Sequence, residues 1–141
     1  MAYWLIKSEP FVYSFEQLLK DGTTRWDGIR NYQARNNLRL MKKGDRLLFY
    51  HSNEGLAIVG TAKVNVTAYP DPTVEADAKQ KDWSAIDVVP DKKLKRPITL
   101  KEAKADPVLS ESALVKNSRL SVQPFTKAEF ERVIELSKQN G

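Results

Sequence analysis

The sequence predicts an α+β domain with a largely antiparallel, barrel-like sheet. Segments with strand character lie near both ends of the chain and in its middle, and helical patterns lie between them. These strands and helices do not alternate regularly, and no segment repeats along the chain. Because regular strand–helix alternation is the pattern of parallel βαβ units, its absence favours an α+β arrangement with antiparallel pairing.

The first half of the chain predicts a buried strand, two helices and a hairpin. Aromatic and branched residues form the first strand, and a proline ends it. Both helices have apolar residues at helical spacing and a glycine at their end. A Ser-Asn-Glu-Gly turn joins the two strands of the hairpin. In chain order the elements are a strand at 3–6, a helix capped by Ser14 and stopped at Asp21-Gly22, a helix at about 31–42, and strands at 46–51 and 56–66.

The second half of the chain predicts shorter elements. Thr99 and Thr126 each precede a glutamate by three residues, which is the capping-box spacing at a helix start. Pro97 favours a sheet edge for its strand, and Pro124 ends the last strand. In chain order we expect a loop at 69–73, an exposed acidic segment to Asp82, neighbouring strands at 83–89 and 94–98, a helix at 99–105, a helical turn at 111–115, a strand at 119–122 and a final helix after Thr126.

Length and composition indicate one globular domain. The 141 residues, 41% of them hydrophobic, are expected to form a single domain over residues 1–141. The absence of cysteine excludes disulfides, thiolate metal sites and cysteine nucleophiles. The first residues do not resemble a signal peptide, and no apolar run has the length of a membrane span. We therefore expect a cytoplasmic monomer with no membrane contact, no metal and no cofactor.

The positive charge of the chain is concentrated in one segment. Residues 25–46 contain seven basic residues and two acids, so they carry a net charge of +5, which equals the net charge of the whole chain. Amide and aromatic side chains are interleaved with these charges. A local basic excess of this kind is typical of a site for a polyanion that carries bases.

The helix within this segment predicts two different faces. Ala34, Leu38 and Met41 share one face and are expected to be buried. A second face carries Tyr32, Arg35, Asn36 and Arg39. Guanidinium groups suit phosphates and can stack on bases, whereas the alternative is a solvated basic face that only aids solubility.

Trp26 lies in a turn just before this helix and has two interpretations. It is either a core anchor or the wall of a pocket that stacks on a flipped base. Such pockets combine aromatic walls with groups that bind the base edge, so Tyr32 is a second candidate wall and Asn31 a candidate edge contact.

The sequence has few features that are typical of an enzyme. His51 is the single histidine, and in a strand end it is more often packed or hydrogen-bonded than catalytic. Ser8 and Ser52 are available hydroxyls, but the chain has no nucleophile elbow, Walker A loop or Gly-x-Gly-x-x-Gly loop. Asp71, Glu75 and Asp77 form an acidic group that is read as a solvated loop.

Several blocks of the sequence resemble the EVE domain family, in that family's order and over essentially the whole chain. The blocks are Tyr3-Trp-Leu-Ile-Lys-Ser-Glu-Pro, Trp26-Asp-Gly-Ile-Arg-Asn-Tyr-Gln-Ala-Arg-Asn-Asn-Leu-Arg, Phe49-Tyr-His-Ser, Asp71-Pro-Thr, Trp83-Ser-Ala-Ile-Asp-Val and Arg119-Leu-Ser-Val-Gln-Pro. The resemblance implies a PUA-like fold, which is a small curved mixed β-barrel flanked by short helices, and kinship with YTH and SRA modules.

The resemblance also implies a non-enzymatic module that holds a modified base, in particular a methylated cytosine derivative in DNA. Two alternatives remain: an enzyme on modified nucleobases or nucleotides, with His51 as acid–base, and an RNA-binding module without base selectivity. Arg119 and Ser121 are second-rank site candidates. The first-rank residues are Lys7, Ser8, Trp26, Arg30, Asn31, Tyr32, Arg35, Tyr50, His51 and Ser52.

Overall fold

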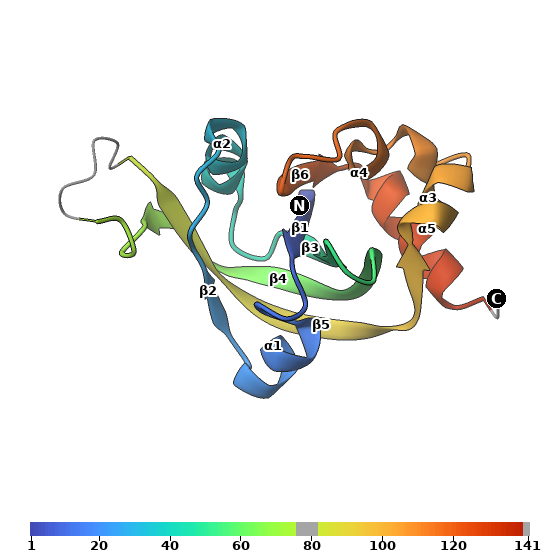
Figure 1. The fold of residues 1–141 in the computed structure, drawn as a ribbon, viewed down its shortest axis with the longest axis horizontal. Coiled ribbons are helices and arrows are strands. Elements are labelled where there is room, and N and C mark those ends of the chain that lie inside the picture. The colour runs from blue at the N-terminus through green and yellow to red at the C-terminus, as the bar shows by residue number, and fades with distance from the viewer. Residues whose placement is uncertain (76–81, 140–141) are drawn as a thin grey trace.

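The computed structural model describes residues 1–75 and 82–139, and it contains one six-stranded sheet with short helices around it (Figure 1). In Figure 1, α1 is drawn below the long β4–β5 pair and α2 above it, and the C-terminal helices α3, α4 and α5 lie together beside the C-terminus. The elements are β1 (Tyr3–Ser8), α1 (Phe15–Asp21), β2 (Thr24–Trp26), α2 (Tyr32–Leu40), β3 (Arg46–His51), β4 (Ala57–Pro70), β5 (Ser84–Thr99), α3 (Leu100–Ala105), the 3-10 turn η1 (Leu109–Glu111), α4 (Ala113–Lys116), β6 (Val122–Phe125) and α5 (Lys127–Ser137).

The sheet is mixed and is not closed. Its strand order is β2-β5-β4-β3-β1-β6, so β2 and β6 are its edges within the described residues. β1 and β3 pair in parallel, and the other neighbours pair antiparallel. The predicted α+β class and mixed pairing are confirmed, whereas the expected barrel is an open sheet whose long strands are bent by several register shifts in the β4–β5 ladder.

The central strands are buried on both faces, which explains their nearly continuous apolar sequences. Successive side chains of a strand point to opposite faces. Trp4 and Ile6 of β1 therefore join one core with α1 and α2, while Leu5 joins a second core with α3 and α5. The two cores lie on opposite sides of the sheet, and together they determine its register.

Gly60 shows how tightly α1 packs on the first core. A Cβ atom added at Gly60 would lie 2.3 Å from the ring of Phe15, the first residue of α1. The ring therefore occupies the space above a glycine in β4, and any larger residue there would have to displace the Phe15 ring.

The predicted helix starts are confirmed by their capping bonds. The side chains of Ser14, Thr99 and Thr126 each accept a hydrogen bond from the backbone N–H three residues later, and Thr126 forms a full capping box with Glu129. The expected buried face of α2 is also confirmed, since Ala34, Leu38 and Met41 are buried.

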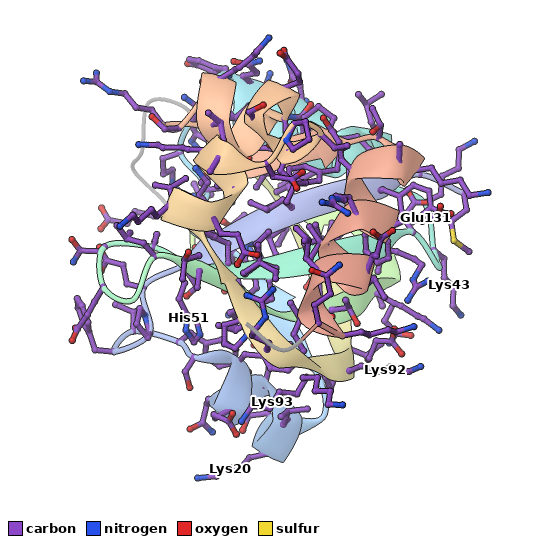
Figure 2. The ribbon with its side chains drawn as sticks, turned by 90° about the vertical axis from the view of Figure 1, so that its right-hand side faces the viewer. Lys20, Lys43, His51, Lys92, Lys93 and Glu131 are labelled. Carbon is purple, nitrogen blue, oxygen red and sulfur yellow. The ribbon has the colours of Figure 1, made fainter. Side chains whose placement is uncertain are left out.

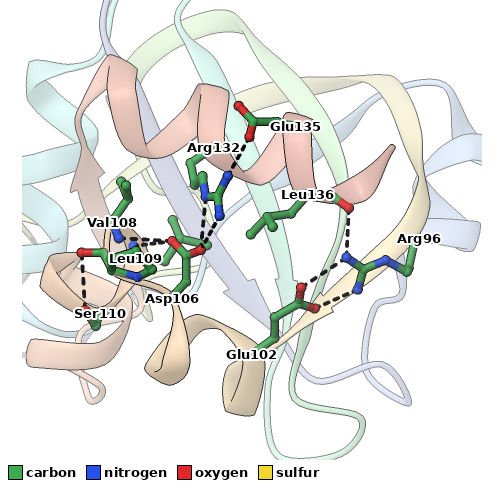
Figure 3. A network of polar contacts seen from close by, with 10 residues as sticks. Arg96, Glu102, Asp106, Val108, Leu109, Ser110, Arg132, Glu135 and Leu136 are labelled. Carbon is green, nitrogen blue, oxygen red and sulfur yellow. Dashed lines mark hydrogen bonds and ion pairs between the residues drawn. The ribbon is translucent and has the colours of Figure 1, made fainter. Parts of the chain in front are cut away.

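Ion pairs dock α5 onto the elements beside it (Figure 3). Arg96 of β5 donates to both carboxylate oxygens of Glu102 and to the carbonyl of Leu136 at 2.8 Å. Arg132 of α5 donates to the carboxylate of Asp106, whose other oxygen accepts from the N–H groups that begin η1. These charged hydrogen bonds join α3, η1, α5 and the end of β5.

The structure corrects four predicted elements. The strands expected at 83–89 and 94–98 are one strand, β5, whose second part pairs with β4 rather than with its first part. Pro124 lies inside the edge strand β6 and does not end a strand at 119–122. The loop expected from 69 begins within β4, which continues to Pro70, and β2 was not predicted because three residues are too few to show alternation.

No helix among the described residues is long and apolar enough to cross a membrane.

Candidate functional site

A cavity of about 320 Å³ opens between the end of β1, the segment before α1, and β2 with the turn that follows it. Two sequence-predicted site residues from β1 and one from β2 meet there. The described residues that line it are Lys7, Ser8, Val12, Tyr13, Thr24, Arg25, Trp26, Asp27 and Ile29. Its volume lies at the lower end of small-molecule sites, which suits one base or nucleoside.

Trp26 forms a wall of this cavity and also belongs to the core. Its surface is 7% exposed, and its ring meets the ring of Phe49 edge-on at 5.4 Å and that of Tyr13 at 6.3 Å. β2 holds it in place by pairing Trp26 with Ile86 of β5. The two interpretations of Trp26 are therefore compatible, since the ring that packs against Phe49 and Tyr13 also lines the cavity.

Polar groups at the cavity have defined orientations. The Ser8 hydroxyl donates to the carbonyl of Tyr13 at 2.7 Å, so the lone pairs of its oxygen are available as acceptors. The Asp27 carboxylate accepts from Arg25 at 2.6 Å. Lys7 donates to the carbonyl of Ser118 at 2.7 Å, and burial lowers the pKa of its ammonium group.

Asp71 holds the turn that lines the cavity. Its carboxylate accepts from the backbone N–H of Gly28, from Arg30 Nη1, and from the backbone and hydroxyl of Thr73. Burial alone would raise the pKa of Asp71, but the hydrogen bonds from Thr73, Arg30 and Gly28 outweigh it and lower the pKa to about 2. The side chain of Asp71 is fully buried, so reading it as part of a solvated loop was wrong; Glu75 is exposed, and Asp77 lies outside the described residues.

The predicted residues of the α2 side gather at a different place. Tyr32 stacks on Trp83 with ring centroids 5.1 Å apart and an interplanar angle of 27°. Arg35 lies 5.0 Å from the Tyr32 ring centroid, and Arg30 lies 5.6 Å from that of Trp83. Asn31 caps α2, because its side-chain oxygen accepts from the Ala34 N–H at 2.9 Å. None of these residues is among those that line the cavity.

The predicted residues at the end of β3 lie beside the end of β1, where Tyr50 pairs with Lys7 and His51 pairs with Ser8. Tyr50 is buried in the second core, and burial raises its pKa. His51 lies near the start of α1, where its Nε2 atom accepts a hydrogen bond from the Phe15 N–H at 3.1 Å (Figure 2). Burial lowers the pKa of His51, with a partial opposing effect from Glu16. The N–H of Ser52 donates to the carbonyl of Ser8 at 2.9 Å.

Of the second-rank candidates, Ser121 contacts β1 and Arg119 does not show such a contact among the described residues. The carbonyl of Ser121 accepts from the backbone N–H of Lys7 at 3.1 Å. Arg119 is exposed on the segment before β6.

The fold places additional acids beside the basic segment. Arg30 pairs with Asp71, Arg35 and Arg39 pair with Asp82, and Arg46 pairs with Asp91. These three carboxylates are distant in sequence, and they reduce the local net charge from +5 to +2. The segment is thus less basic in the folded protein than its sequence indicates.

Sequence reasoning missed several cavity residues. Val12, Tyr13 and Thr24 lie outside every motif, and Asp27 lies inside the block that begins at Trp26 but was not predicted to be a site residue. These residues meet because the segment before α1 faces β2. The described residues contain no group of three or more His, Cys, Asp or Glu that could hold a metal ion.

The open mixed sheet with its short helices defines a PUA-like domain, and the cavity lies where β1 and β2 meet the segment before α1. The EVE domain model matches residues 2–136, so the chain belongs to the EVE domain family.

Solved structures support both statements. An Agrobacterium tumefaciens protein, Atu2648, is 45% identical with a TM-score of 0.92, and the match covers 98% of this chain and 94% of that one. Human THYN1, solved in complex with DNA containing 5-methylcytosine, is 36% identical with a TM-score of 0.90, and the match covers 100% of both chains. The YTH domain of Zygosaccharomyces rouxii MRB1 is 16% identical with a TM-score of 0.61 over 99% of this chain and 88% of that one, which shows a shared fold.

Proposed function

We propose that this protein binds nucleic acid by holding one modified base, a methylated cytosine in DNA, in the cavity walled by Trp26. The observation that carries the proposal is this aromatic-walled cavity in a chain that is 36% identical to human THYN1, a protein solved with 5-methylcytosine DNA. A base enters such a cavity only after it leaves the helical stack.

The lining offers the contacts that a methylated cytosine needs. Trp26 supplies an aromatic wall, and Val12 and Ile29 supply apolar surface for a methyl group. The Ser8 oxygen and the Asp27 carboxylate are acceptors for the exocyclic amine of cytosine, which is a hydrogen-bond donor. In this proposal Lys7, Ser8 and Trp26 contact the base, while Tyr50, His51 and Ser52 hold the end of β1 through their pairing with Lys7 and Ser8.

Family membership supports a binding module rather than an enzyme. The relative described above is solved as a complex with modified DNA. The one histidine of the chain also has a structural role, because its Nε2 lone pair accepts a hydrogen bond from the Phe15 N–H. A general base needs that lone pair for its substrate.

Binding to matched oligonucleotides tests the proposal. Fluorescence anisotropy would compare one duplex with cytosine, 5-methylcytosine or 5-hydroxymethylcytosine at its centre, and RNA of the same sequence with and without methylated bases. We expect the methylated DNA to bind more tightly than the unmodified duplex. Equal affinity for all DNAs, or a preference confined to RNA, would contradict the proposal.

Variants link this preference to the cavity. Trp26→Ala should reduce the preference, since a stacking ring contributes roughly 1–3 kcal/mol. Because Trp26 also packs in the core, Val12→Glu tests the same reduction in preference at an exposed residue. Val12 is 71% exposed, so the change places a carboxylate at the cavity without disturbing the core. Val108→Glu, on an exposed residue before η1, is the matched control and should bind as the wild type does.

A further inference from the structure

A second aromatic surface lies outside the cavity, where Tyr32 at the start of α2 stacks on Trp83 before β5. We propose that Tyr32 is a stacking platform for another base of the same strand, close to the base held in the cavity. The proposal rests on the proposed function and adds a second contact that selects unstacked or distorted nucleic acid.

Trp83 and Tyr32 differ in their exposed fractions, and this difference shows which of the two rings faces the solvent. Trp83 is 8% exposed, whereas Tyr32 is 55% exposed. The near-parallel angle of 27° between them makes Trp83 a buried support and leaves Tyr32 as the outer layer. An exposed flat ring on a rigid support is the arrangement on which bases stack in proteins that bind single strands.

Two guanidinium groups hold this stack and give it positive charge. Arg35 lies 5.0 Å from the Tyr32 centroid and 5.8 Å from that of Trp83, and Arg30 lies 5.6 Å from that of Trp83. Arg30 is fixed by the buried carboxylate of Asp71, and Arg35 donates to Asn36 and Asp82. A ring that is already held in place loses little conformational entropy when a base stacks on it.

The platform is close enough to the cavity to contact the same strand. Ile29 lines the cavity, and Tyr32 follows it by three residues. Three residues of chain span at most about 10 Å, while successive nucleotides of one B-DNA strand are about 3.4 Å apart along the axis. Because the two residues are this close along the backbone, we expect a base that stacks on Tyr32 to be within a few nucleotides of the base in the cavity.

Abasic oligonucleotides test this inference. Each duplex carries one central 5-methylcytosine and one abasic position at one of the three sites on either side of it. Tyr32→Ala should weaken binding to the intact duplex about 5- to 20-fold, in the range of one lost base–ring stack. At one abasic position, wild type and Tyr32→Ala should bind equally, because the stacking base is gone. Tyr32→Phe, which keeps the ring, should stay within about twofold of the wild type.

Controls separate the platform from folding and from the cavity. Circular dichroism establishes that the variants are folded, and Leu40→Ala, a change at an exposed residue of the same helix, should bind as the wild type does. Tyr32→Ala should keep the preference for methylated over unmodified DNA. An unchanged affinity of Tyr32→Ala, or a loss that is the same at every abasic position, would overturn the inference. If the wild type has no preference for methylated DNA, the proposed function is wrong, but the platform can still be tested. The same comparison of Tyr32→Ala with the wild type is then made on unmodified single strands with and without an abasic position.

Discussion

The backbone N–H of Gly28 donates a 2.9 Å hydrogen bond to the carboxylate of Asp71, 43 residues farther along the chain. Gly28 has a φ of 74°, so the turn it occupies suits glycine, and that turn carries Asp27 and Ile29 to the cavity. Asp71 itself does not line the cavity, and we infer that it acts through the turn by positioning these residues.

Asp71→Ala should destabilise the protein and weaken ligand binding together. The change leaves the N–H of Gly28 and the guanidinium of Arg30 without their acceptor, which costs about 2–4 kcal/mol in the free energy of unfolding. Urea denaturation measures this cost, and Glu75→Ala, an exposed acid in the same loop, is the matched control. A stable Asp71→Ala protein with unchanged affinity would show that the turn holds its shape without the carboxylate.

Acid should remove the contribution of Asp71 between about pH 4 and pH 2. Its folded pKa of about 2 lies below the ordinary value of 3.8, so the unfolded chain binds a proton first as the pH falls. The contribution is therefore full above the unfolded pKa and is lost as the pH falls through the folded one. Urea midpoints of wild type and Asp71→Asn should differ most above pH 4 and converge toward pH 2. A gap that does not change with pH would mean that Asp71 is not ionised in the folded protein.

His51 should make α1 and the cavity sensitive to mild acid. Its Nε2 atom accepts the Phe15 N–H only when the ring is neutral, and burial lowers its pKa below 6.5. Below pH 6.5 the unfolded chain therefore binds a proton that the folded chain resists, and the free energy of unfolding falls as the pH falls. Glu16 of α1, whose charge opposes this shift in part, remains in place in both proteins.

His51→Gln provides the comparison for this effect, because an amide oxygen also accepts the Phe15 N–H but does not titrate. Between pH 7.5 and pH 5.0, wild type should lose more stability in urea and more affinity for methylated DNA than the variant does. Parallel losses in the two proteins would assign the pH dependence to other groups.

The affinity for nucleic acid should depend only moderately on salt. With a local net charge of +2, we expect log affinity to fall with log salt with a slope of about −2. Asp82→Asn removes the carboxylate that pairs with Arg35 and Arg39, so it should raise the affinity at low salt and steepen the slope by about one. Glu131→Gln, which removes one charge from α5, is the control and should leave the slope unchanged. A slope near zero in the wild type would contradict a role of this segment in binding phosphates.

The sequence by itself determined the local elements and the family. Capping residues and helical spacing act over three or four positions, so the helices after Ser14 and Thr126 and the buried face of α2 could be predicted from neighbouring residues alone. The blocks around Trp26 and at β1 likewise identified the EVE family, and Lys7, Ser8 and Trp26 do meet at one cavity.

Only the tertiary structure decided which charges and rings meet. Asp71 lies 41 residues from Arg30, and Asp82 lies 47 residues from Arg35, so no local pattern could show that these carboxylates neutralise the basic segment. The same long-range packing separates Tyr32, which stacks on Trp83, from Trp26, which borders the cavity. Burial decides the outcome for Asp71, because a carboxylate that would be solvated in an open loop becomes a fixed acceptor when the sheet brings a cation and N–H groups around it.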